Sequence, residues 1–293
     1  MLEEKEFYLY VESHILDYLP EMEGKKAMVQ RVKKNNQISM MGLSIGEQKN
    51  YLLPVLYLEP FYRNYLGGQS LDETMKEIAR VYKGHQIGFY LDEDKVSDYE
   101  HIKKNLFYRI VNYEKNKEAL QYAPHERFLD LAVTYRWAAY RNHDGMASAM
   151  VRNKELLMWG VSKDQMMRDA RENTEKIFPP VMRKVQSVLP IRIIEPEIPL
   201  FVMSNGDYMN GASVILYKDV LKDFAKYMEH DLFILPSSIH EVIILLDDEY
   251  AKSPQELAMM VRETNRMVVD REEILSDHVY YYDRQKDEIR IAK

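Results

Sequence analysis

The stretch from Leu200 to Asp248 constrains the fold more than any other part of the chain. It contains apolar runs of strand length, separated by Gly, Asn and Pro residues that favour turns. Strands are expected at 200–203, 212–216, 231–235 and 241–246, with a helix at 218–229. Because strands joined by short turns pair antiparallel, the stretch predicts an α+β layer with helices on one face of a mainly antiparallel sheet.

The same pattern continues to the C-terminus. Ser253-Pro-Gln-Glu256 is a capping box with proline at the first helical position, where its missing N–H costs nothing. Closing strands are expected at 279–282 and 288–291, which completes a C-terminal ββαββαββ layer. Pro190, Pro196 and Pro199 favour a linker. The predicted domains are an N-terminal α+β region at 1–189 and a C-terminal α+β region at 199–293, with one continuous domain as the alternative.

The N-terminal region carries clear local signals. Helical spacing of apolar residues predicts a helix over 4–19 that stops at Pro20, and the Asn35-Asn36 pair predicts a turn between two strands. Capping boxes at Ser70–Glu73 and Ser162–Gln165 each open a helix. The remaining expectations are strands at 26–33, 37–45, 52–58, 131–137 and 147–151, a loop or helix start at 92–98, a strand or helix at 104–111, and a short helix from Pro179-Pro180 to Val188.

The composition excludes several classes of function. The chain contains no cysteine, so disulfides, thiolate zinc sites, iron–sulfur clusters and cysteine nucleophiles are ruled out. A net charge of -7 argues against a nucleic-acid or anionic-membrane binder. Nucleic-acid association through a local basic patch such as Arg31–Lys34 is a third, weaker reading. The N-terminus lacks a signal-peptide pattern, and no apolar run approaches the roughly 18 residues of a membrane span. We expect a cytoplasmic protein without a cofactor.

One local group of residues is compatible with hydrolase chemistry. Ser237 or Ser238 could act as a nucleophile with His240 as base and Glu241 as the orienting carboxylate. The alternative is structural: Pro236-Ser-Ser turns the chain between two strands, and the hydroxyls bond to turn amides. The structural reading is preferred, because no Gly-x-Ser-x-Gly elbow is present to expose a serine.

Two further groups are candidates for binding. Asn205, Asp207 and Asn210 lie in Gly-containing turns that could contact a ligand, although their spacing matches no phosphate-binding loop. The acidic cluster 247–249, with Asp231 nearby, offers oxygens to a cation, but it matches no known calcium loop. The eight histidines are scattered. The sequence therefore predicts no metal site.

Six short motifs carry a resemblance to a known family. They are Tyr57–Tyr62, Asn112–Asn116, Phe128–Leu131, Trp159–Ser162, Asn210–Tyr217 and Leu235–Val242, of which the last two are the most specific. Together they resemble an uncharacterised bacterial family known only as a domain of unknown function, DUF5688, over nearly the whole chain. The resemblance implies one conserved architecture and a bacterial cytosolic setting. It implies no activity, ligand or catalytic residue.

These observations favour a non-catalytic cytoplasmic binding or accessory protein, because no complete catalytic constellation is present. The alternative is a hydrolase that uses Ser237 or Ser238 with His240. The partner is unknown. A protein partner is compatible with the 22 tyrosines and 18 methionines, since these residues make adaptable contacts where they are exposed.

Overall fold

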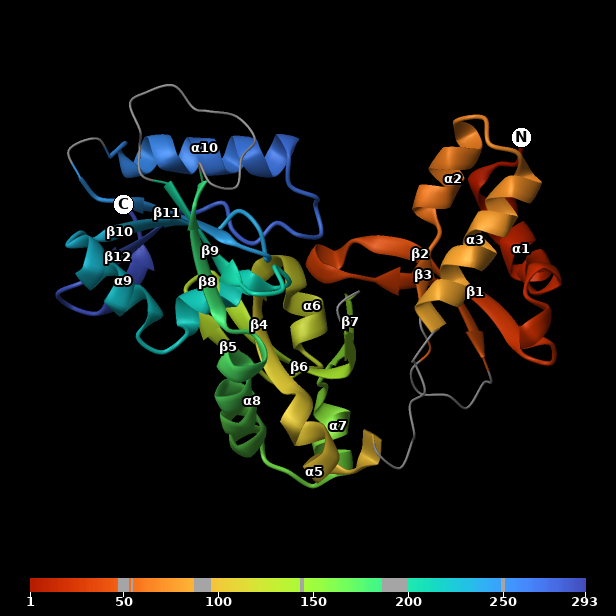
Figure 1. Ribbon diagram of the computed structural model, residues 1–293, viewed down its shortest axis with the longest axis horizontal. Helices are drawn as coiled ribbons and strands as arrows, with labels where there is room; N and C mark the ends of the chain where they lie inside the picture. The colour runs from red at the N-terminus through yellow and green to blue at the C-terminus, as the bar shows by residue number, and fades with distance from the viewer. Residues whose placement is uncertain (47–52, 54, 87–95, 143–144, 186–199, 249–250) are drawn as a thin grey trace. The chain divides into compact units, whose positions relative to one another are not determined.

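The computed structural model describes residues 1–46, 53, 55–86, 96–142, 145–185, 200–248 and 251–293. The chain divides into two compact units (Figure 1). Unit 1 comprises Met1–Asp98 with Ala139–Ala147, and unit 2 comprises Tyr99–Ala138 with Ser148–Lys293. Helices and three mainly antiparallel sheets make up the chain, which confirms the predicted α+β class.

Unit 1 is a small sheet covered by helices. Its elements are α1 (Glu4–His14), β1 (Lys26–Lys33), β2 (Ser39–Gly46), β3 (Leu56–Tyr57), α2 (Glu59–Leu66) and α3 (Leu71–Gln86). The β1–β2 hairpin is confirmed, with Lys33 opposite Ser39 at its closed end. The first helix ends earlier than predicted, at His14, and a 3₁₀ turn continues it from Ile15 to Tyr18. The Ser70–Glu73 capping box is present, because each residue's side chain bonds the other's amide.

One hydrophobic core joins the elements of unit 1. Phe7 and Val11 of α1 are fully buried with Leu43 of β2 and with Met75 and Ile78 of α3. The apolar side of α3 therefore faces the core of unit 1. The side chain of Tyr82 is also buried in this cluster, and its hydroxyl accepts from the amide of Ile45 at 2.6 Å.

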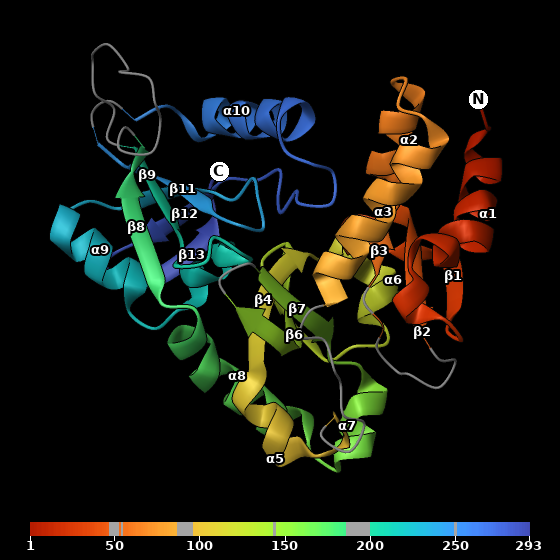
Figure 2. The same ribbon diagram turned by 45° about the vertical axis from the view of Figure 1, so that its right-hand side comes forward.

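Unit 2 contains two sheets, except for the adjoining ends of β6 and β7 within Ala139–Ala147, which belong to unit 1 (Figures 1 and 2). The first has the order β4-β6-β5, with β7 paired to β6; the second has the order β13-β12-β10-β11-β9-β8. The strands are β4 (Leu106–Asn112), β5 (His125–Phe128), β6 (Leu131–Asn142), β7 (Gly145–Met150), β8 (Pro180–Lys184), β9 (Leu200–Asn205), β10 (Leu232–Leu235), β11 (Val242–Leu246), β12 (Tyr280–Asp283) and β13 (Glu288–Ile291). The helices are α5 (Tyr99–Ile102), α6 (Lys117–Leu120), α7 (Asn153–Trp159), α8 (Lys163–Ile177), α9 (Val220–Met228) and α10 (Pro254–Met267).

Helices cover both faces of the six-stranded sheet, whereas the sequence analysis placed them on one face. Leu200 packs with the cluster that holds Leu257 of α10, while the next residue, Phe201, contacts Phe224 of α9 edge-on. Successive strand residues point to opposite faces, so α9 and α10 lie on opposite sides (Figure 1). The continuous apolar runs of β10 and β11 are the sequence sign of such two-sided burial.

Two predicted elements are wrong. Residues 212–216 were expected as a strand but belong to a 3₁₀ helix, Gly211–Leu216, in which Gly211 to Ile215 are all buried. An apolar run buried on every side has no period that distinguishes the two structures. The segment after Pro179 was expected as a helix but forms edge strand β8, where Pro180, as the first residue, needs no ladder hydrogen bond. The ambiguous segment 104–111 is strand β4.

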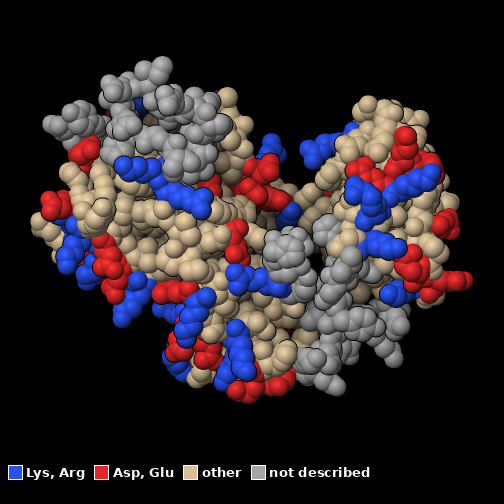
Figure 3. Space-filling view, in the orientation of Figure 1, with Lys and Arg blue, Asp and Glu red and all other residues tan. Residues whose placement is uncertain are grey.

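The predicted boundary between 189 and 199 does not coincide with the division into units. It lies between β8 and β9, which pair antiparallel in one sheet, and residues 186–199 fall outside the described part of the chain. Charged side chains of both signs are interspersed over the described surface in the view of Figure 3. In the same described ranges, no helix is long and apolar enough to cross a membrane.

Candidate functional site

A group of polar side chains and loops meets inside unit 2. We call it the polar junction; it consists of residues 236–241 and 273–278 together with Asn112, Asp130 and Asn210. Backbone hydrogen bonds align the two loops: the amides of Leu275 and Ser276 donate to the carbonyls of Ser237 and Pro236, at 3.0 and 2.9 Å. Ser238 forms a β-bridge with Ile274. The loop after β10 is thereby held against the loop that leads into β12.

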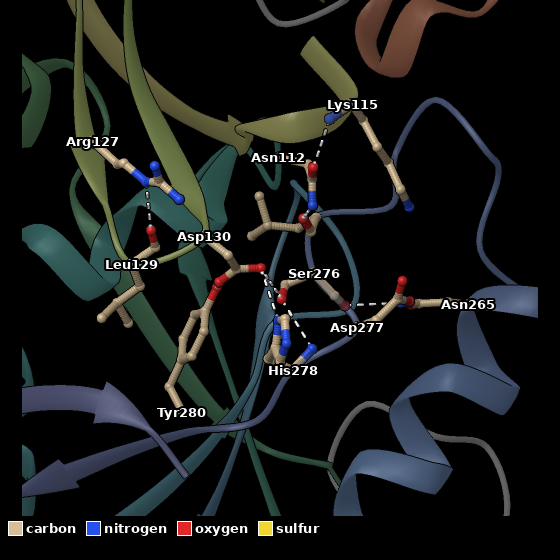
Figure 4. A network of polar contacts seen from close by, with 11 residues as sticks. Asn112, Lys115, Arg127, Leu129, Asp130, Asn265, Ser276, Asp277, His278 and Tyr280 are labelled. Carbon is tan, nitrogen blue, oxygen red and sulfur yellow. Dashed lines mark hydrogen bonds and ion pairs between the residues drawn. The ribbon is translucent and has the colours of Figure 1, made fainter. Parts of the chain in front are cut away.

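Asp130 is the centre of this junction (Figure 4). Its Oδ2 accepts from the hydroxyl of Ser276 at 2.6 Å, and its Oδ1 accepts from the hydroxyl of Tyr280 at 2.6 Å. Nδ1 of His278 lies 3.1 Å from Oδ2. One carboxylate thus joins the β5–β6 turn to the segment that enters β12, and bonds to a charged acceptor are stronger than bonds between neutral groups.

Local structure explains the position of Asp130. Phe128 pairs with Leu131, so Leu129 and Asp130 form a two-residue hairpin turn between β5 and β6. Leu129 has a φ of 54°, a conformation that costs a non-glycine residue about 1–3 kcal/mol. The contacts of Asp130 offset this strain. The carbonyl of Asp130 also accepts from the amide of Tyr113, which ties the turn to the end of β4.

Ser276, His278 and Asp130 have the residue types of a hydrolase triad but not its geometry. Ser276 donates to the carboxylate, not to the histidine ring, and its oxygen accepts from the amide of His278 at 3.0 Å. Its side chain is also fully buried. His278, in contrast, is half exposed. A nucleophile needs contact with its base and access to substrate, and Ser276 has neither.

Two asparagines extend the junction. Asn112, at the end of β4, donates to the carbonyl of Leu275 at 3.0 Å. Asn265, buried on α10, donates to the carbonyl of Ser276 and to the carboxylate of Asp277, each at 2.8 Å. The loop 275–278 is therefore held from both sides, which orders the segment that carries Ser276 and His278.

Burial also controls the ionisation of Tyr280. Desolvation, followed by the adjacent charge of Asp130, holds the pKa of this phenol well above its ordinary value. Both causes disfavour the phenolate. Tyr280 therefore stays a neutral donor to Asp130 throughout the physiological pH range.

His240 lies in the second half of the junction, and both nitrogens of its ring are engaged. Nε2 lies 3.2 Å from Oε1 of Glu273, and Nδ1 lies 3.4 Å from the amide nitrogen of Asn210 and 3.2 Å from the carbonyl oxygen of Tyr208. Donation from Nε2 to Glu273 leaves Nδ1 to accept from Asn210. In that arrangement no lone pair of the ring is directed at a serine hydroxyl.

The structure does not assemble the serine–histidine pair that the hydrolase alternative requires. The hydroxyl of Ser238 accepts from the backbone amide of His240 at 3.0 Å, as expected for a turn, and Ser237 takes part through its carbonyl. The carboxylate beside the ring is Glu273, from a distant loop, and not Glu241. Among the described residues, no serine hydroxyl bonds to the His240 ring.

The three candidate binding residues have different environments. Asn205 is buried and holds its own turn, with Nδ2 donating to the carbonyl of Met209 and Oδ1 accepting from the amides of Asp207 and Met209. The side chain of Asp207 is exposed. Asn210 adopts a φ of 55° and its Oδ1 accepts from the guanidinium of Arg109 at 3.1 Å. Only Asn210 belongs to the junction.

Close packing explains the glycine that follows Asn210. A Cβ at Gly211 would lie 2.5 Å from the carbonyl oxygen of His240 and 2.7 Å from the amide nitrogen of Asn205, and would overlap the hydroxyl of Ser204. That hydroxyl donates to the His240 carbonyl at 2.7 Å. Glycine is thus required at position 211, because the backbones at Asn205 and His240 approach it closely. The Asn-Gly pair also has the turn chemistry that the sequence indicated.

The acidic cluster is organised around a tyrosine. Asp231 and Asp247 face each other at the ends of β10 and β11, and their Oδ2 atoms lie 2.8 and 2.7 Å from the hydroxyl of Tyr281. Asp231 also accepts from the amide of Arg284. Over the described ranges, no group of three or more His, Asp or Glu side chains is placed to hold a metal ion. Glu249, the last acidic residue of the predicted cluster, lies outside those ranges.

With this geometry established, comparison with known proteins identifies the family. A model of a family of unknown function, DUF5688, matches residues 4–284. The chain belongs to this family. The match spans both units and includes every residue of the polar junction. No curated protein and no solved structure matches the chain.

The sequence analysis missed Asp130, Arg109, Glu273, Ser276 and His278. A signal was present for Asp130, because it lies in the Phe128–Leu131 motif that supports the family resemblance. Arg109 stands in an otherwise apolar stretch, a pattern that was not interpreted, whereas Glu273, Ser276 and His278 stand in ordinary charged or polar surroundings. Ser276 is 146 residues from Asp130 and Glu273 is 33 residues from His240, so no local spacing connects them.

Proposed function

We propose that this protein is a non-catalytic cytoplasmic binding or accessory protein. The observation that carries the proposal is that the side chains of Ser238 and His240, on which the hydrolase alternative depends, bond to other groups and not to each other. The His240 ring contacts Glu273, Tyr208 and Asn210, while the Ser238 hydroxyl is used by a turn amide. Polar groups satisfied in this way fix loop geometry, and the hydroxyl of Ser238 and the ring of His240 do not contact each other as a nucleophile and its base would.

An exposed apolar surface supports a protein partner. Met259, Met260 and Met267 lie on the outer side of α10, with exposed fractions of 56, 43 and 74%. The inner side of the same helix buries Leu257 and Val261. Methionine side chains adapt to partners of different shape, and apolar surface exposed on a helix is favourable to cover.

The test combines an activity screen with affinity capture. The purified protein is first assayed against ester, amide and phosphoester substrates, and the wild type and an S237A/S238A variant are expected to be equally inactive. A serine-dependent turnover would refute the proposal in favour of the hydrolase alternative.

Capture from a bacterial lysate then compares the wild type with an M259S/M260S/M267S variant. Leu157→Ser on α7 serves as the control, because Leu157 is equally apolar and 83% exposed but belongs to another helix. We expect a partner that the wild type and the control retain and the triple variant loses. Capture that is the same for all three proteins would exclude the α10 surface.

A further inference from the structure

Arg109 is a charged residue in the middle of a buried strand. Its neighbours on β4, from Leu106 to Asn112, are all buried, and Arg109 itself is partly buried. Its Nε is enclosed and has no hydrogen-bond partner, while Nη1 donates to Oδ1 of Asn210 at 3.1 Å. No carboxylate of the described chain lies within ion-pair distance of the guanidinium.

A cation in this position lacks the compensation that buried charges normally have. Burial alone lowers the pKa of Arg109 to about 10, with no charged neighbour contributing, so the group remains protonated at neutral pH. Buried arginines are nearly always paired with an anion or a set of acceptors. Elsewhere in unit 2, Arg171 is paired with Glu126 at 2.6 Å. Within the described ranges, the guanidinium of Arg109 has one neutral acceptor, Oδ1 of Asn210.

The contact with Asn210 also determines which part of the guanidinium is unused. Nη1 is occupied, so the edge formed by Nε and Nη2 has no partner in the described chain. This edge presents two parallel N–H groups at the spacing of two oxygens of a carboxylate or phosphate. Asn210 fixes the orientation of the guanidinium through its Oδ1.

We propose that Arg109, together with Asn210, is the receptor for a small oxyanion, a carboxylate or phosphate group carried by the ligand of this protein. The inference rests on the proposed binding function and names the chemistry of the bound group. Because Nε is enclosed, the residues around it rearrange locally when the anion engages both nitrogens of the edge. The anion supplies the counter-charge that the strand lacks.

Thermal unfolding with added anions tests the inference. Inorganic phosphate and acetate are titrated at constant ionic strength against a chloride reference, with the wild type, Arg109→Met and Arg127→Met. Arg127 is the matched control, because it is an exposed arginine of β5, in the same sheet, and lies over the ring of Tyr113. We expect a saturable rise in Tm for the wild type and the control that Arg109→Met abolishes.

The two anions distinguish the sources of the oxyanion. A response to phosphate alone indicates a phosphorylated ligand, and a response to acetate alone indicates a carboxylate. Arg109→Lys retains the charge but loses the two-pronged edge, so it is expected to weaken binding about tenfold. Asn210→Ala, measured beside Arg109→Lys, removes the second proposed contact and is also expected to weaken the response to the anion.

Stability without added anion separates a binding role from a structural one. An uncompensated cation disfavours the folded state, so Arg109→Met is expected to have a Tm equal to or above that of the wild type in chloride. A lower Tm would overturn the inference, as would equal phosphate and acetate shifts in all three proteins or no shift in the wild type. Capture of a partner through α10 is scored independently, so either proposal can fail alone.

Discussion

Replacing Asp130 by alanine is expected to destabilise unit 2 by about 4 kcal/mol. The substitution removes the acceptor of three contacts, from Ser276, Tyr280 and His278. Ser276 and Tyr280 are both fully buried, and each buried donor left without a partner costs about 1–3 kcal/mol. His278 is half exposed, so water replaces its contact at little cost. The sum is a large part of the 5–15 kcal/mol that typically stabilises a domain.

Urea denaturation followed by tryptophan fluorescence measures this cost directly. The chain has two tryptophans, Trp137 and Trp159, and both belong to unit 2, so the signal reports on that unit. Asp164→Ala is the control, because Asp164 is an exposed carboxylate in the first turn of α8 and contributes at most about 1 kcal/mol.

A double-mutant cycle identifies the source of the energy. Tyr280→Phe alone should cost about 1–1.5 kcal/mol, and less when Asp130 is already alanine, because the hydroxyl has then lost its acceptor. A cost below about 1 kcal/mol for Asp130→Ala would refute the reasoning, since it would mean that water satisfies the buried hydroxyls. Strict additivity of the two substitutions would refute the direct contact.

Three further predictions concern Gly211, Ser253 and Tyr280. Gly211→Ala should destabilise unit 2 by about 3 kcal/mol, because the added Cβ overlaps the backbones of His240 and Asn205; a loss below about 1 kcal/mol in urea unfolding would contradict this packing. Ser253→Ala should cost about 1 kcal/mol and speed amide exchange in the first turn of α10, whose capping box it breaks, and unchanged exchange there would count against the cap. The pKa of Tyr280 is raised in the folded state, so its stabilising contribution is complete below the unfolded-state pKa of about 10 and is lost as the pH rises above that value. The free energy of unfolding should therefore fall steeply from pH 10 upward, and less steeply in Tyr280→Phe. Identical slopes for the two proteins would exclude this group as the cause.

Local structure followed the sequence closely. The capping boxes at Ser70 and Ser253 form as predicted, since each depends on residues three positions apart. At Ser162 only half of the predicted box forms: the hydroxyl accepts from the amide of Gln165, whereas the Gln165 side chain donates to Asp169. The β1–β2 hairpin and the antiparallel pairing of β10 with β11 depend on short turns and apolar patterning, and both are present. The errors at 179–188 and 212–216 arose where neighbouring elements, and not local preference, select the conformation: β9 pairs with β8, and Ser204 and His240 close around Gly211.

The site required the tertiary structure. The sequence placed histidine and serine in one turn and predicted that the serines satisfy turn amides, which Ser238 does. It could not show that Glu273 contacts His240 or that Ser276 and Tyr280 converge on Asp130. Nor could it show that Arg109 lies beside Asn210 with no counter-charge from the described part of the chain.

By itself, then, the sequence determined the α+β class, the helix starts, the first hairpin, the absence of cysteine chemistry and, through its motifs, the family. Only the tertiary structure decided which helices cover which face of the sheet and which polar groups meet. The physical reason is the separation of the interacting residues along the chain. Caps and turns are interactions between neighbours in the chain, whereas the partners of Asp130 lie 146 to 150 residues away and are brought to it by the packing of whole sheets.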